Sequence, residues 1–130
     1  MNLEELLATM PFAVLAGVEL LAADKAECRA RMAWDPDRVT LGGAMHGGAL
    51  MTLADSVGAV CAFLNLPEGA GTSTLSSATN LLRGVREGYV EAVSHPLHVG
   101  RSTIVGGTEV RDAAGTLVSS TTQTQAVLTG

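Results

Sequence analysis

Two periodicities divide the chain, one typical of helix and the other of strand. Residues 47–66 are apolar on nearly every helical face, which predicts a helix buried on all sides, and Pro67 and Gly69 end it. Beyond them, runs rich in Thr, Val and Ile alternate with glycine-containing turns and predict strands. The expected strands are residues 72–82, 89–99, 101–111 and 117–128.

The segment before the long helix is less regular. Residues 3–10 predict a short helix that Asn2 caps and Pro11 interrupts. Residues 18–34 suggest two short strands, and residues 35–43 are typical of a turn followed by a loop.

The connections between the later strands are too short for parallel crossovers, so the sheet is predicted to be antiparallel. We expect one domain, residues 1–130, of the α+β class: an antiparallel sheet of five to six strands wrapped around one long central buried helix. A single sheet covers only one side of a helix. The remaining apolar surface therefore predicts a second copy of the chain.

Composition narrows the possible partners. Eight Lys and Arg residues stand against 13 Asp and Glu residues, a net charge of −5, so we expect no nucleic-acid partner. The apolar stretch at residues 10–23 has no Lys or Arg before it and contains Glu19, which argues against a signal peptide. No stretch reaches the roughly 18–20 apolar residues of a membrane span. These features predict a cytoplasmic location and no membrane partner.

The spacing of cysteine and histidine does not predict a metal site. Cys28 and Cys61 lack CxxC spacing and suit small buried side chains in a reducing compartment. His95 and His98 lie in a strand-like stretch, where a separation of three residues would point them to opposite faces.

One carboxylate stands out in the apolar helix. The neighbours of Asp55 one turn away, such as Met51 and Ala59, offer no opposite charge. Burying an unpaired carboxylate is costly. Asp55 therefore either caps a backbone group or contacts a distant arginine, or it is a general base or nucleophile in a dry pocket.

A glycine-rich string, residues 42–48, runs into the start of the same helix. Glycine at Gly47 leaves no side chain between a ligand and the free N–H groups of the first turn, which favour a developing oxyanion. A flexible loop would also explain the string. Gly47 and Asp55 are eight residues apart, about 12 Å along a helix, too far to contact one carbonyl. Either only one of them acts, or two antiparallel helices bring Gly47 of one subunit near Asp55 of another.

Residues 46–55, HGGALMTLAD, resemble the signature of hotdog-fold acyl-CoA thioesterases of the phenylacetate-degradation (PaaI-like) and 4-hydroxybenzoyl-CoA type. The resemblance extends to Pro11-Phe12 before the first strand, to the Ser/Thr strand after the helix, and to residues 99–101. It implies a hotdog fold and hydrolysis of a small acyl-CoA or aryl-CoA thioester by a homodimer or homotetramer. No cofactor is implied, because CoA is part of the substrate.

The resemblance also implies roles for individual residues. Gly47 would polarise the thioester carbonyl through its N–H, His46 would orient the loop or substrate, and Asp55 would be the general base or the nucleophile. Ser73 matches a polar residue that assists water or the acid in relatives, with Thr74 as the neighbouring alternative. The substrate-binding residues would be Thr40, Gly48, Thr74, Asn80, Arg83 and Arg101.

Thr40 departs from the family pattern. Relatives often carry Asn or Gln six residues before the histidine, and a threonine hydroxyl is shorter and lacks the amide NH₂. The threonine therefore puts in doubt how fast the protein hydrolyses a thioester more than where its active site lies. Arg83, Arg86 and Arg101 are candidates to pair with CoA phosphates, although each could equally be a solvated arginine at a strand end.

Three alternatives stay open. The first is a hotdog dehydratase or hydratase, in which the histidine is itself the base. The second is a non-catalytic protein that binds acyl thioesters. The third is a structural oligomer in which Asp55 is buried and no ligand binds.

Overall fold

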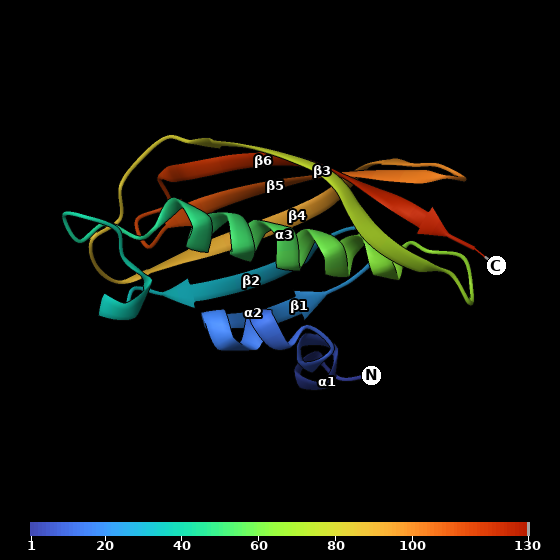
Figure 1. Cartoon of the computed structure of the whole chain (residues 1–130), viewed down its shortest axis with the longest axis horizontal. Helices are drawn as coiled ribbons and strands as arrows, with labels where there is room; N and C mark the ends of the chain where they lie inside the picture. The colour runs from blue at the N-terminus through green and yellow to red at the C-terminus, as the bar shows by residue number, and fades with distance from the viewer. Residues whose placement is uncertain (130) are drawn as a thin grey trace.

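One long helix crosses a six-stranded antiparallel sheet that curves around it (Figure 1). The helix, α3, spans Gly47–Leu64, and the strand order is β1-β2-β4-β5-β6-β3. The computed structural model describes residues 1–129. The predicted α+β arrangement, a sheet wrapped around a central helix, is confirmed.

Two strands precede α3 and four follow it. A short 3₁₀ helix, Pro36–Arg38, lies in the loop before α3. The later strands begin and end within two residues of their predicted positions. The strands are β1 (Val18–Ala23), β2 (Cys28–Ala33), β3 (Gly71–Leu81), β4 (Tyr89–Val99), β5 (Thr103–Asp112) and β6 (Leu117–Leu128).

Two short helices, α1 (Leu3–Ala8) and α2 (Pro11–Ala16), precede the sheet. The predicted break of the first helix before Pro11 is confirmed, but the prediction that Pro11 and Phe12 lead into the first strand was wrong. Pro11 opens α2, because proline fits the first turn of a helix, where its missing N–H is not needed. Gly17 ends α2 in the left-handed conformation, with φ 88°.

α3 packs one face against the sheet. Leu53 and Val57 are fully buried there, whereas Met51 and Phe63 on other faces remain 40% and 44% exposed. One sheet covers one side of α3, as predicted, and the remaining faces stay exposed in a single chain. α3 is also long and apolar enough to span a membrane, with a mean hydropathy of 1.6, so the expectation that no segment reaches this length was wrong. Here α3 is the core helix, half buried against the sheet.

A β-bulge in β4, between Pro96 and His98, changes which way the histidines point. His95 and His98 are opposite Gly107 and Val105 of β5, which share one face of their strand. The prediction of opposite faces was wrong because the bulge inserts one extra residue. Within residues 1–129, no three His, Cys, Asp or Glu side chains group together as metal ligands would.

Candidate active site

His46 and two glycines build the start of α3. His46 is the N-cap, and its Nδ1 accepts a hydrogen bond from the Gly48 N–H at 2.9 Å. The His46 N–H donates to the Arg38 carbonyl oxygen at 2.8 Å, which ties the helix to the preceding loop. Among the hydrogen bonds of residues 1–129, none uses the Gly47 N–H. Gly47 therefore presents the free donor of the first turn.

Neighbouring side chains occupy the space that the two helix-opening glycines leave. A Cβ on Gly47 would lie 2.6 Å from Leu81 Cδ1, and one on Gly48 would lie 3.0 Å from His46 Nδ1. The expectation that glycine leaves this approach open needs correction, because Leu81 and the His46 ring lie beside it. A side chain at either position would displace one of them.

Asp55 lies two turns along α3 and is half-buried. Its Oδ1 accepts hydrogen bonds from the Thr74 hydroxyl of β3 at 2.9 Å and from Gln123 Nε2 of β6 at 3.2 Å. No hydrogen bond within residues 1–129 uses its Oδ2. Asp55 is thus neither a backbone cap nor an arginine partner. Two neutral donors hold one of its oxygens, and the other is free.

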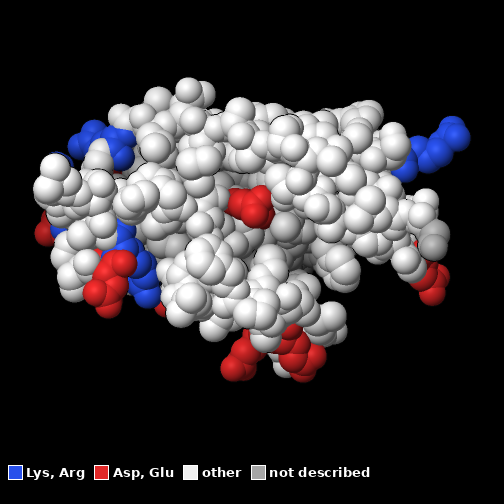
Figure 2. Space-filling model, in the orientation of Figure 1, with Lys and Arg blue, Asp and Glu red and all other residues white. Residues whose placement is uncertain are grey.

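Asp55 opens into a hollow between α2, α3 and β3. Phe12, Met51 and Ser77 are among the residues that line this hollow. Figure 2 shows a lone acidic group in a depression at the centre of this face, with basic groups only towards its ends. A carboxylate in such a hollow can act as a base towards water, or attack a carbonyl carbon, in a molecule bound there.

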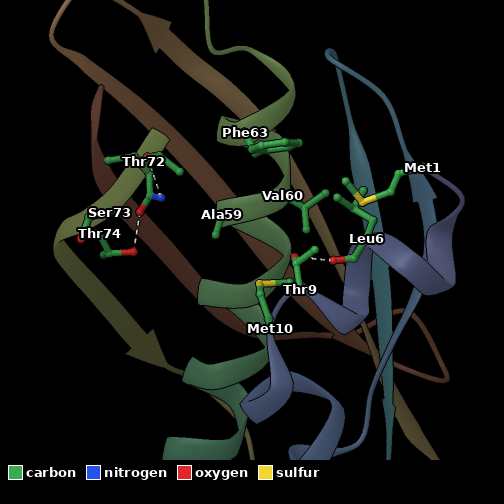
Figure 3. Close-up of a pocket in the computed structure, with 11 residues that line it drawn as sticks. Met1, Leu6, Thr9, Met10, Ala59, Val60, Phe63, Thr72, Ser73 and Thr74 are labelled. Carbon is green, nitrogen blue, oxygen red and sulfur yellow. Dashed lines mark hydrogen bonds between the residues drawn. The ribbon is translucent and has the colours of Figure 1, made fainter. Parts of the chain in front are cut away.

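An apolar cavity of about 380 Å³ lies next to the hollow that Asp55 lines, and Met10 lines both (Figure 3). Met10 lines it beside α1, and Val60 and Phe63 line it from α3. β3 forms the opposite wall, where Thr74 contributes both to the cavity and to the hydrogen bonding of Asp55. An apolar group held in this cavity would contact Thr74, whose hydroxyl is hydrogen-bonded to the carboxylate.

Thr74, rather than Ser73, reaches the acid. Successive strand residues point to opposite faces, and the Thr74 side chain is turned towards Asp55, so the Ser73 side chain points away from the acid. Ser73 still lines the apolar cavity (Figure 3). Asn80 is on the outer face of the sheet, because its neighbour Thr79 shares a hydrogen bond with a buried threonine of β6.

Thr40 lies in the exposed loop before α3 and does not line the hollow around Asp55. Its backbone N–H donates to the Ala44 carbonyl oxygen, and its own carbonyl oxygen accepts from the Gly43 N–H. The loop turns at Gly42 and Gly43, whose φ values of 90° and 86° favour glycine. Gly42 and Gly43 therefore allow the loop to turn and are not candidates to stabilise an oxyanion.

One chain does not bring the candidate arginines together. Arg83 follows β3, with its Nε 3.9 Å from Asp112 Oδ2, and shares a hollow with Arg86. Asp112 is opposite Val90, near the start of β4, whereas Arg101 lies in the turn after the far end of this 11-residue strand, which is roughly 33 Å long. Arg83 and Arg101 of a single chain therefore cannot contact the same phosphate.

The sequence analysis missed Gln123, which donates to the acid, and two residues that contact Gln123, namely Gln125 and Gly58. A Cβ on Gly58 would lie 2.1 Å from Gln123 Oε1, so glycine makes room for this side chain. Gly58 itself was a signal in the sequence. A glycine inside a helix costs about 1 kcal/mol of stability relative to alanine, so its presence suggests that another side chain packs against it.

An antiparallel sheet wrapped around one long helix is the hotdog fold, and comparison with known proteins identifies the family. Residues 42–119 match the thioesterase superfamily, and the chain belongs to this superfamily. It is 40% identical over 85 residues to an esterase of Vibrio cholerae and 37% identical over 86 residues to the 1,4-dihydroxy-2-naphthoyl-CoA hydrolase of Escherichia coli.

The two matched segments cover 65% and 66% of this chain but only 57% and 63% of those relatives. A crystal structure of a mutant thioesterase from Pseudomonas aeruginosa has a TM-score of 0.92 and 30% identity, over 98% of this chain and 94% of that one. The expected family and fold are confirmed.

Proposed function

We propose that the protein hydrolyses a small acyl-CoA or aryl-CoA thioester to the free acid and CoA. Asp55 carries this proposal: one oxygen is held by Thr74 and Gln123, and the other faces a hollow beside an apolar cavity. The name of the Escherichia coli relative supports a CoA thioester as substrate. The cavity would hold the acyl group, and CoA would lie outside it.

The reaction needs a donor for the carbonyl oxygen and a group that activates the attack. The Gly47 N–H would stabilise the oxyanion, and Asp55 would either take a proton from the attacking water or attack the carbonyl carbon itself. In both routes the C–S bond breaks, and the sulfur leaves with CoA. The second route passes through an anhydride between Asp55 and the acyl group, which water then hydrolyses.

The two groups belong to different subunits in this proposal. Within α3 they are separated by eight residues, or about 12 Å, whereas both must approach one carbonyl to about 3 Å. A homodimer with antiparallel α3 helices would pair Gly47 of each chain with Asp55 of the other, creating two sites.

The edge strand β3 supports such a dimer. β3 is last in the strand order, pairs only with β6, is largely exposed and has no charged residue. A long uncharged edge readily pairs with another strand. Pairing β3 with β3 of a second copy would extend the sheet and place the two α3 helices side by side. We expect this homodimer to pair further into a homotetramer.

A thiol-release assay with short-chain, long-chain and aryl-CoA esters tests the activity. We expect turnover that falls at least a hundredfold in Asp55→Asn and is kept in the control Asp24→Asn, a turn residue that caps the Ala26 N–H. Binding of CoA esters without turnover of any of them would contradict the proposal and favour a binding protein.

The role of His46 separates hydrolysis from dehydration. His46 Nδ1 already accepts a hydrogen bond from the Gly48 N–H. This nitrogen therefore caps the helix and is not available as a base. We expect His46→Ala to keep more thioesterase activity than Asp55→Asn. The reverse order, together with hydration of an enoyl-CoA, would favour the dehydratase.

A further inference from the structure

A buried hydrogen-bond network lies behind Asp55. Gln123 and Gln125 occupy successive helix-facing positions of β6 and are 1% and 2% exposed. Gln123 Nε2 donates to Asp55 Oδ1 at 3.2 Å and to Gln125 Oε1 at 3.3 Å. Gln125 Nε2 donates in turn to the Thr72 hydroxyl at 3.2 Å, and that hydroxyl donates to the Ala126 carbonyl oxygen at 2.8 Å. The network joins the acid to β3 and β6, the strands on one side of the cavity in Figure 3.

The neighbours of Gln123 determine which end of its amide faces Asp55. Asp55 Oδ1 and Gln125 Oε1 are both acceptors, so only the NH₂ end fits between them. Gln123 Oε1 is left buried with no hydrogen-bond partner within residues 1–129, in space that Gly58 leaves free. A buried acceptor without a partner destabilises a fold. Stability alone therefore does not explain glutamine at this position.

Thr74 links the acid to the same network. Its hydroxyl has one proton but two acceptors within reach, Asp55 Oδ1 and Gln125 Oε1. While Asp55 is a carboxylate, Oδ1 is the stronger acceptor. When Oδ2 takes up a proton, Oδ1 weakens, and the Thr74 proton can turn to Gln125. The network thus accommodates both states that a general base passes through.

We infer that Gln123 is the positioning residue of Asp55. Its amide, together with the Thr74 hydroxyl, holds Oδ1 and leaves Oδ2 as the reacting oxygen. Gln125 orients the Gln123 amide, and Gly58 makes room for it. The role of Oδ2 as the reacting oxygen rests on the proposed hydrolysis. The hydrogen bonds that Oδ1 accepts from Thr74 and Gln123 do not depend on it.

Gln123→Met tests the inference, because it keeps the length of the side chain and removes the donor. The control Thr121→Val removes a buried side-chain hydrogen bond, 2.7 Å long, from the same face of β6. We expect kcat to fall about tenfold or more in Gln123→Met with KM changed less than about threefold, and both to be kept in the control. We also expect Tm to be kept or raised, because the unpaired Oε1 is gone. A lower Tm with unchanged kcat would show a structural role and overturn the inference.

Gly58→Ala is a second variant, which displaces Gln123 without altering its chemistry. We expect the double variant Gly58→Ala/Gln123→Ala to have a kcat no lower than that of Gly58→Ala alone, because the hold is already lost. Fully additive losses would overturn the inference.

NMR separates this inference from the proposed function. If the wild-type protein cleaves no thioester, the proposed function fails. The exchange rate of the Gln123 Nε2 protons with solvent then tests the inference without any activity measurement. We expect them to exchange slowly with solvent in the wild type and in Thr121→Val, and faster in Asp55→Ala. Equal exchange in all three proteins would overturn the inference.

Discussion

At the residue scale, the hydroxyl that reaches Asp55 belongs to Thr74 and not to Ser73, which points away from the acid. We predict that Thr74→Ser keeps most of the thioesterase activity, because the hydroxyl remains. Thr74→Val should lower kcat about tenfold through loss of a hydrogen bond to a charged group. Ser73→Ala should have little effect. Steady-state kinetics of the three variants checks this order, and a larger loss in Ser73→Ala than in Thr74→Val would contradict it.

The sequence sufficed to locate Asp55, Gly47 and His46, because one helix holds all three at fixed spacing. It could not show what holds Asp55. Thr74 and Gln123 are 19 and 68 residues away along the chain, and they meet the acid only through the register of β3 and β6. That register shifts at a bulge after Thr74, which no local pattern marks.

At the element scale, β3 is one of the two edge strands of the sheet, and Leu75 lies exposed at its bulge. Leu97 is a matched control, because it lies similarly exposed at the bulge of β4, an internal strand. We predict that Leu75→Lys shifts the protein towards monomer and lowers its activity, since a charge on an edge opposes strand pairing. Leu97→Lys should stay dimeric. Sedimentation of both variants tests this, and a dimeric Leu75→Lys would count against pairing through β3.

Cys28 of β2 and Cys61 of α3 are both buried in the core. The interaction of the two thiols and their burial raise the pKa of Cys61, while the same interaction lowers the pKa of Cys28 to about 7 against the effect of burial. Because both thiols are buried, access limits their reaction more than protonation does. We predict that a disulfide reagent labels neither cysteine in the native protein and labels both on unfolding in urea. Rapid stoichiometric labelling of the native protein would contradict this packing.

The long elements were predictable because their periodicity is strong, and the short ones were not. α3 and the four later strands follow from apolar and β-branched patterns over ten or more residues. α2 is only six residues long, and its signals are the cap positions Pro11 and Gly17 rather than a period. The exposed face of α3 could not be separated from the buried one, because both are apolar.

At the scale of the whole molecule, the proposed mechanism divides each chain into two half-sites. The free N–H of Gly47 and the carboxylate of Asp55 lie on one rigid helix, and no motion within that helix can bring them together. The central claim is therefore that a second copy completes each site.

Removing the Gly47 N–H alone requires a designed variant. Proline fits this first helical position, and His46 before it already has ψ 133°, an angle that a following proline allows. A side chain at this position would crowd Leu81, so both Gly47→Pro and its control Gly47→Ala are made in a Leu81→Ala background. The control keeps the N–H and should stay active, whereas the proline variant should not.

Mixing the inactive Gly47→Pro chain with an Asp55→Asn chain, by unfolding and refolding them together, tests the central claim most directly. In each hybrid dimer one site receives both defects and the other receives none. We predict recovery of about a quarter of the activity of the Leu81→Ala background, because half of the dimers are hybrids with one intact site each. Refolded mixtures that form hybrid dimers but stay as inactive as the separate variants would contradict the shared site.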